Sequence, residues 1–107
     1  KDGLACGFDK SREARRTLAR LRRMMHDVMK DYDVLLVPAA SGEAPVGLNA
    51  TGNASHCLIG TSTHVPCMTL PLFKGPNGLP VGAQLMAARN NDRLLFEVAR
   101  WVFGSAA

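Results

Sequence analysis

The segment that decides the fold is Val65–Ala87, with the sequence VPCMTLPLFKGPNGLPVGAQLMA. Two apolar runs flank Gly75-Pro76-Asn77-Gly78, and clusters of glycine, proline and asparagine are typical of tight turns. The segment therefore predicts an antiparallel hairpin over residues 67–87, with strands near 67–73 and 81–87.

Three positions in this hairpin have a defined backbone role. Pro71 lacks a backbone donor, so we expect a bulge or an edge position in the first strand. Asn77-Gly78 suits a turn that requires positive φ. Gly82 lies inside the second strand, where it indicates a bulge or the close approach of another backbone.

Upstream, residues 9–31 have the pattern of an amphipathic helix, preceded by a loop over residues 1–8. Apolar side chains recur at alternating spacings of four and three, which places them on one stripe of the helix. The stripe consists of Ala14, Leu18, Leu21, Met25, Val28 and Tyr32, and Met29 widens it. Asp9 or Ser11 is placed to cap the first turn of this helix.

A short strand is predicted directly after the helix. Residues 34–37 form the apolar run Val-Leu-Leu-Val, which ends at Pro38. Because the run has no polar alternation, it favours a strand that is buried on both faces. A helix followed at once by such a strand favours an α/β layer over a helix bundle.

The other segments complete an α/β fold. Residues 39–52 have the composition of a loop, and residues 50–63 fit either a loop or a short helix capped by Thr51 or Asn53. A last helix is predicted over 91–103 from its apolar spacing. The expected order is helix, strand, loop or short helix, antiparallel hairpin and helix, in a single piece over residues 1–107.

Composition limits the class of protein. A chain of 107 residues forms one domain at most, and its formal charge of +4 is modest. Its three cysteines form no disulfide framework, which fits a reduced, cytoplasmic setting. No apolar run approaches the roughly 20 residues that cross a bilayer, so we expect no membrane partner. The first residue is Lys1 rather than Met, which hints at residues upstream.

Arginine is concentrated in the first helix, at Arg12, Arg15, Arg16, Arg20, Arg22 and Arg23. Such a row could bind a polyanion by releasing its counterions, which makes a small basic module for nucleic acid or an acidic partner the alternative function. No aromatic residues interleave with the row to stack on bases. A solvated helix face is therefore the favoured interpretation.

A self-contained catalytic or metal centre is not apparent. His56, Cys57, His64 and Cys67 are zinc-ligand types, but they lack the paired spacing of a zinc site. Ser55 neighbours His56 in sequence without any Gly-x-Ser-x-Gly motif. We therefore predict no catalytic residue, no metal ligand and no cofactor for this chain.

Several segments, in order, resemble the C-terminal region of the amidase signature family of hydrolases. They are Tyr32–Pro38, Ala44-Pro45, Thr61–Pro71, Gly78–Leu85 and Asp92–Leu95. The string Gly-Leu-Pro-Val-Gly-Ala-Gln-Leu at 78–85 is the most specific of them. The resemblance implies that this α/β chain is the C-terminal piece of a larger mixed-sheet amidase fold.

The resemblance also implies a function for the parent enzyme. Such enzymes hydrolyse linear carboxamides by serine-nucleophile acyl transfer, without a metal or an organic cofactor. No position of this chain matches the family's catalytic lysine, its two serines or its glycine-rich loop. By itself the chain is therefore expected to be inactive, and to complete the sheet and border the substrate cleft.

The resemblance places three residues near a small-molecule amide substrate. Thr61, Ser62 and His64 are the candidate substrate-pocket residues, and the alternative is that they only end a helix and pack. A sheet without its partner strands would also expose an edge and apolar surface, so a homodimer through that edge is a further expectation.

Overall fold

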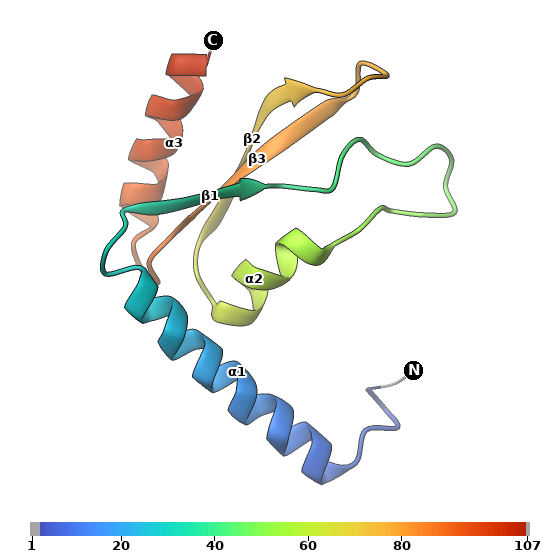
Figure 1. Ribbon diagram of the computed structural model, residues 1–107, viewed down its shortest axis with the longest axis vertical. Helices are drawn as coiled ribbons and strands as arrows, with labels where there is room; N and C mark the ends of the chain where they lie inside the picture. The colour runs from blue at the N-terminus through green and yellow to red at the C-terminus, as the bar shows by residue number, and fades with distance from the viewer. Residues whose placement is uncertain (1–2, 107) are drawn as a thin grey trace.

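The computed structural model describes residues 3–106, and its helices and strands follow the predicted order (Figure 1). They are α1 (Phe8–Val28), β1 (Val34–Pro38), α2 (Ser55–Thr63), β2 (Cys67–Lys74), β3 (Pro80–Ala87) and α3 (Asp92–Ala106). This confirms the α/β class and resolves residues 50–63 in favour of a short helix. The first two residues of the predicted N-terminal loop lie outside the described part of the chain.

The three strands form one antiparallel sheet in the order β1-β3-β2. The predicted hairpin is β2 and β3, so β2 lies at an edge of this sheet. The register between these strands shifts between Leu70 and Phe73, which places an irregularity at Pro71. Pro71 thus has both the edge position and the break in pairing that its missing donor requires.

Gly82 of β3 lies close to β2 and to Ala39, the residue that follows β1. A Cβ atom at this position would lie 2.5 Å from Thr69 Cγ2, 3.1 Å from Ala39 Cβ and 3.3 Å from the Leu70 carbonyl oxygen. The close approach inferred from the sequence is therefore present. At the tip of the hairpin, Gly78 has φ 81°, in the region that favours glycine.

The tip of the hairpin is held by a residue far away in the sequence. One Glu43 carboxylate oxygen accepts hydrogen bonds from the backbone N–H groups of Asn77 at 2.9 Å and Leu79 at 3.0 Å. The other oxygen accepts one from Asn77 Nδ2 at 2.7 Å. The loop after β1 therefore closes over the turn, which no local sequence pattern indicated.

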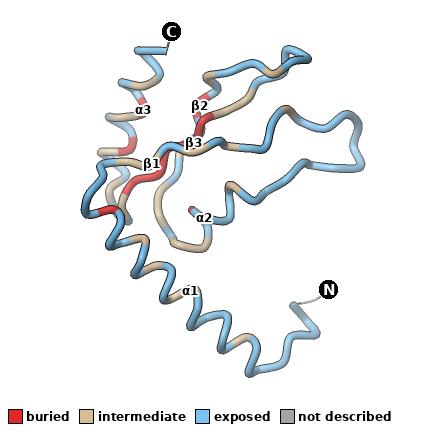
Figure 2. The backbone as a smooth tube through the Cα atoms, in the orientation of Figure 1, coloured by how far each residue is buried: buried red, intermediate tan, exposed pale blue. Residues whose placement is uncertain are grey.

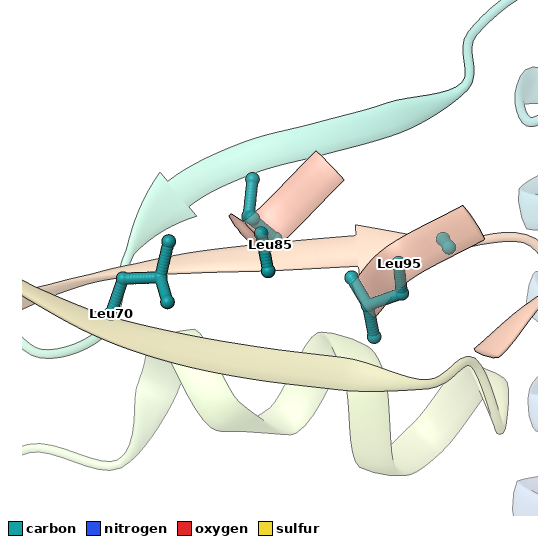
Figure 3. Packing of buried hydrophobic residues seen from close by; sticks show 5 residues of the cluster. Leu70, Leu85 and Leu95 are labelled. Carbon is teal, nitrogen blue, oxygen red and sulfur yellow. The ribbon is translucent and has the colours of Figure 1, made fainter. Parts of the chain in front are cut away.

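The core lies between one face of the sheet and α3. Leu70, Leu85 and Leu95 converge there, as Figure 3 shows, together with Ala87 and Ala99. All five residues 83–87 of β3 are buried. In Figure 2 the buried backbone follows β3 and the facing side of α3, while most of α1 is exposed.

Two expectations about the N-terminal half were wrong. The strand at 34–37 is not buried on both faces: Leu36 is 63% exposed, because β1 is an edge strand and the core beneath α3 reaches Val34 but does not cover Leu36. Neither Asp9 nor Ser11 caps α1, which starts after Gly7 without a side-chain cap among the described residues. Asp9 lies in the first turn instead, where it pairs with Arg12 at 3.1 Å.

The predicted stripe of α1 is largely uncovered. Helix α1 ends at Val28, three residues before the predicted end, and none of its residues is buried. It extends away from the sheet and packs mainly against α2 (Figure 1). Among the described residues, no helix has the length and apolar character that crossing a membrane requires.

We predict that Gly82→Ala destabilises the fold by about 1–3 kcal/mol, because the new methyl group meets backbone and side-chain atoms that cannot move aside together. Gly104→Ala is the matched control, since nothing lies within 4 Å of its added Cβ inside α3. The free energy of unfolding of the control should rise by up to about 1 kcal/mol, because alanine has a higher helix propensity than glycine. Urea denaturation measures the free energy of unfolding of both variants. An equal change in Gly82→Ala and Gly104→Ala would contradict the close approach at Gly82.

Glu43→Ala should lower the free energy of unfolding by about 1–3 kcal/mol, because three donors of the hairpin turn lose a charged acceptor. Glu43→Gln keeps one acceptor oxygen, so its free energy of unfolding should fall by a smaller amount. Glu97→Ala removes only the exposed pair with Arg93 and serves as the control with little measurable change. Urea denaturation distinguishes the three variants. A Glu43→Ala unfolding curve that superimposes on that of Glu97→Ala would contradict the role of Glu43 in holding the loop on the hairpin turn.

Candidate functional site

A polar pocket of about 560 Å³ opens at the C-terminal end of α2. Its walls come from α2, the start of β2, the middle of β3 and the connection from β3 to α3. The lining residues are Cys57, Gly60, Thr61, His64, Val65, Pro66, Cys67, Gln84, Arg89, Asn90 and Asp92. Such a volume is in the range of small-ligand sites in proteins.

His64 ends α2 in a left-handed conformation, with φ 60° and ψ 36°. Its backbone N–H donates to the Gly60 carbonyl at 2.9 Å, which closes the last turn of the helix. A residue other than glycine in this conformation costs roughly 1–2 kcal/mol. The turn directs the chain from α2 into β2, and His64 is one of the residues that line the pocket.

Arg22 of α1 holds this turn from the other side. Its Nε donates to the Ser62 carbonyl at 3.0 Å, and its Nη2 lies 2.8 Å from His64 Nε2. Arginine has no acceptor and stays protonated, so Nε2 must be the acceptor in this contact. The neutral imidazole therefore carries its proton on Nδ1.

The three predicted substrate-pocket residues do not share one surface. Thr61 and His64 line the polar pocket, but Ser62 lies on the opposite side of α2, in a groove shared with α1. The helical spacing explains this separation, because successive residues on a helix face different directions. Their contact with a substrate stays a prediction.

Gln84 is a pocket residue that sequence reasoning missed. It occupies the middle of β3, opposite Val37 of β1 and Thr69 of β2, and it is only 7% exposed. Its Oε1 has no hydrogen-bond partner in the described part of the chain. An unsatisfied buried polar atom costs about 1–3 kcal/mol, so this oxygen calls for an explanation. A polar residue within the apolar run of residues 81–87 was the available signal.

Cys57 and Cys67 line the pocket as free thiols, and the surroundings of Cys67 do not favour reactivity. Cys67 is exposed as a residue, but its Sγ packs against Gly60, where an added Cβ would collide with it. Burial, with a smaller effect of Cys57, raises the pKa of the Cys67 thiol. The thiol form is therefore favoured, and the thiolate that nucleophilic chemistry needs is suppressed.

Other candidate chemistry is not assembled by the fold. Among residues 3–106, no group of three or more His, Cys, Asp and Glu side chains is placed to hold a metal ion. Of the arginine row, Arg15, Arg16, Arg20 and Arg23 are exposed on α1, whereas Arg22 turns toward α2. Nucleic-acid binding by this face stays an untested alternative.

The groove that contains Ser62 has a different character. It encloses about 430 Å³ between α1, β1 and α2, and its lining is almost entirely apolar. Leu21, Met24, Met25, Val28, Leu35, Leu58, Ile59, Ser62 and Thr63 line it. Several of these side chains are largely exposed, with Leu58 at 60% and Met24 at 54%. The stripe of α1 therefore faces a groove that the described residues leave open.

Comparison with curated proteins finds relatives along most of the chain. It is 28% identical over 112 residues to the A subunit of mitochondrial glutamyl-tRNA(Gln) amidotransferase from Drosophila pseudoobscura pseudoobscura, covering 94% of this chain and 22% of that protein. It is 32% identical over 118 residues to the Mycobacterium leprae protein named "Putative amidase AmiC", covering 92% of this chain and 25% of that protein. No family model matches the chain.

A solved structure shares the fold. The 6-aminohexanoate cyclic dimer hydrolase superimposes with a TM-score of 0.69 over 88% of this chain and 23% of that one, at 21% sequence identity. The chain thus spans about a fifth to a quarter of the length of the curated relatives it matches. Because these relatives are amidase-signature enzymes, the chain belongs to the amidase signature family, and its residues correspond to the C-terminal region of those enzymes.

Proposed function

We propose that this chain works as the C-terminal part of a carboxamide hydrolase, where it completes the sheet and forms one wall of the substrate site. The chemistry itself belongs to residues outside these 107, since no position matches the lysine or the serines of the family. The isolated chain is then inactive. The family membership and the polar pocket beside α2 support this assignment.

The observation that carries the proposal is the amount of surface that the chain leaves exposed. Its accessible surface is 8263 Å². A compact monomeric protein of 11.5 kDa exposes about 5,800 Å². The excess of about 2,500 Å² is of the size that obligate interfaces bury.

The dimensions of the molecule agree with that excess. Its radius of gyration is 16.5 Å, against about 13 Å for a compact domain of this length, and its smallest extent is only 16 Å. The excess includes the apolar groove between α1 and α2, which is lined by leucine, methionine and isoleucine. A surface of this kind is suited to permanent burial against more protein. We therefore infer that the remainder of an amidase domain covers the groove.

A direct test replaces the matching quarter of the Mycobacterium leprae relative with this chain. The chimera should hydrolyse simple carboxamides, whereas the isolated chain should show no turnover and no labelling by a serine-directed fluorophosphonate. Met24→Asp in the chimera should reduce activity at least tenfold, because it places a charge in the buried groove. Arg16→Asp, on the exposed face of α1, is the matched control. Stoichiometric serine labelling of the isolated chain, or a folded chimera without activity, would refute the proposal.

A second copy of the chain is the other candidate to cover this surface. Both β1 and β2 are edge strands, and unpaired edges of this kind can pair between molecules. If the isolated chain dimerises through an edge, sedimentation at rising concentration should show a monomer–dimer equilibrium. Leu36→Lys on β1 should then weaken the dimer, since a lysine on an edge strand disfavours pairing with a strand of another molecule. A sedimentation coefficient that stays monomeric throughout would argue against the dimer.

A further inference from the structure

We infer that a small cavity between α1, the turn after α2 and the connection after β3 is an oxyanion site that takes a phosphate group. The cavity encloses about 190 Å³ and adjoins the polar pocket beside α2, with which it shares Arg89. Three side chains with nitrogen donors line it, Arg22, His26 and Arg89, together with Thr63 and apolar residues. No acidic residue of the described chain lines it.

The donors come to this cavity from two separate parts of the chain. Arg22 and His26 are four residues apart on α1, which places them one turn apart on the same face of the helix. Arg89 follows β3 and is far away in the sequence. A sphere with the volume of the cavity is only about 7 Å across, so one oxyanion inside it can accept hydrogen bonds from opposite walls.

Arg22 is the anchor of the site. Its residue is half-buried, and the contacts of Nε with the Ser62 carbonyl and of Nη2 with His64 Nε2 hold the guanidinium in place. These two contacts use two of the five N–H donors of the group. No carboxylate pairs with Arg22 among the described residues. A charge that is partly removed from water is usually paired, so the missing countercharge points to an anionic ligand.

The acidic residues that neighbour these cations in sequence do not neutralise them. Asp27 follows His26, but its carboxylate lies 2.7 Å from Lys30 Nζ. Asp92 lines the adjoining polar pocket rather than this cavity, and it forms no ion pair with Arg89 in the part of the chain that the structure describes. The cavity therefore keeps a positive potential that attracts anions.

Phosphate suits this arrangement better than a carboxylate does. The phosphate oxygens point in tetrahedral directions, so donors on separate walls can each meet an oxygen, whereas one arginine fork already satisfies both oxygens of a carboxylate. A phosphate monoester carries a charge of about −1.5 to −2 at neutral pH, which matches two permanent guanidinium charges. The free ion and a small monoester share this chemistry.

The test titrates the 107-residue chain with inorganic phosphate, phenyl phosphate or acetate at constant ionic strength. ¹H–¹⁵N NMR should show phosphate shifting the Nε resonances of Arg22 and Arg89, with a dissociation constant on the order of millimolar. Acetate should bind at least about tenfold more weakly. Tighter binding of phenyl phosphate than of phosphate would identify a monoester as the ligand, and weaker binding the free ion. Equal binding of phosphate and acetate would overturn the inference.

Variants separate this site from the general positive charge of α1. Arg89→Gln should weaken phosphate binding at least about tenfold and leave the melting temperature unchanged, because Arg89 is exposed and has no ion pair among the described residues. Arg22→Gln should weaken binding as much but also lower the melting temperature, since it loses the contacts with the turn after α2.

Arg16→Gln, on the exposed face of α1, is the matched control and should keep the phosphate affinity of the unaltered chain. If Arg16→Gln weakens binding as much as Arg89→Gln does, phosphate follows the net charge of the chain and the site is rejected. Unchanged binding by Arg89→Gln would also reject it. Because binding is measured without turnover, either result stands whether or not a chimera hydrolyses carboxamides.

Discussion

The structure depends on β3, which pairs with β1 on one side and with β2 on the other. Five successive residues of this strand are buried, so both of its faces are covered at once. One face carries Leu85 and Ala87 into the core beneath α3. The other carries Gln84 into the pocket beside α2. The core and the candidate site are therefore two faces of one strand.

Outside β3 the packing is incomplete, and the exposed apolar face of α1 is the main example. Helix α1 buries none of its residues, although its stripe has the composition of a core-facing helix. An amphipathic helix gains most of its stability by packing its apolar face, so a helix left open in this way supports the proposal that the remainder of an amidase domain packs against it. The coverage of the relatives agrees with that proposal, since the chain spans only 22% and 25% of the length of two of them.

Local patterns predicted the elements well, because each depends on neighbours in sequence. The hairpin, the break at Pro71 and the close approach at Gly82 follow from the backbone limits of proline and glycine. The burial of β1 was predicted wrongly because a local pattern does not show where a strand lies in the sheet. An apolar run shows that a strand can be buried, but its position at the edge of the sheet decided that Leu36 is exposed.

The candidate site was only partly predictable. Thr61 and His64 were identified through a resemblance to known enzymes, and the pocket contains both, but Ser62 lies across the helix. Gln84 gave little signal, because a polar residue in a strand is ordinary unless its surroundings leave it unpaired. The hydrogen bond that sets the tautomer of His64 joins residues from separate elements, and no local pattern contains it.

From its sequence alone this chain has a recognisable family, an α/β class and a hairpin whose turn and bend are set by glycine and proline. These follow from steric limits on the backbone, which act over a few residues. The tertiary structure decided which residues meet: Glu43 with the hairpin tip, Arg22 with His64, and Gln84 with an open pocket. Such contacts depend on how whole faces pack, and packing joins positions 34 to 42 residues apart that sequence periodicity treats as independent.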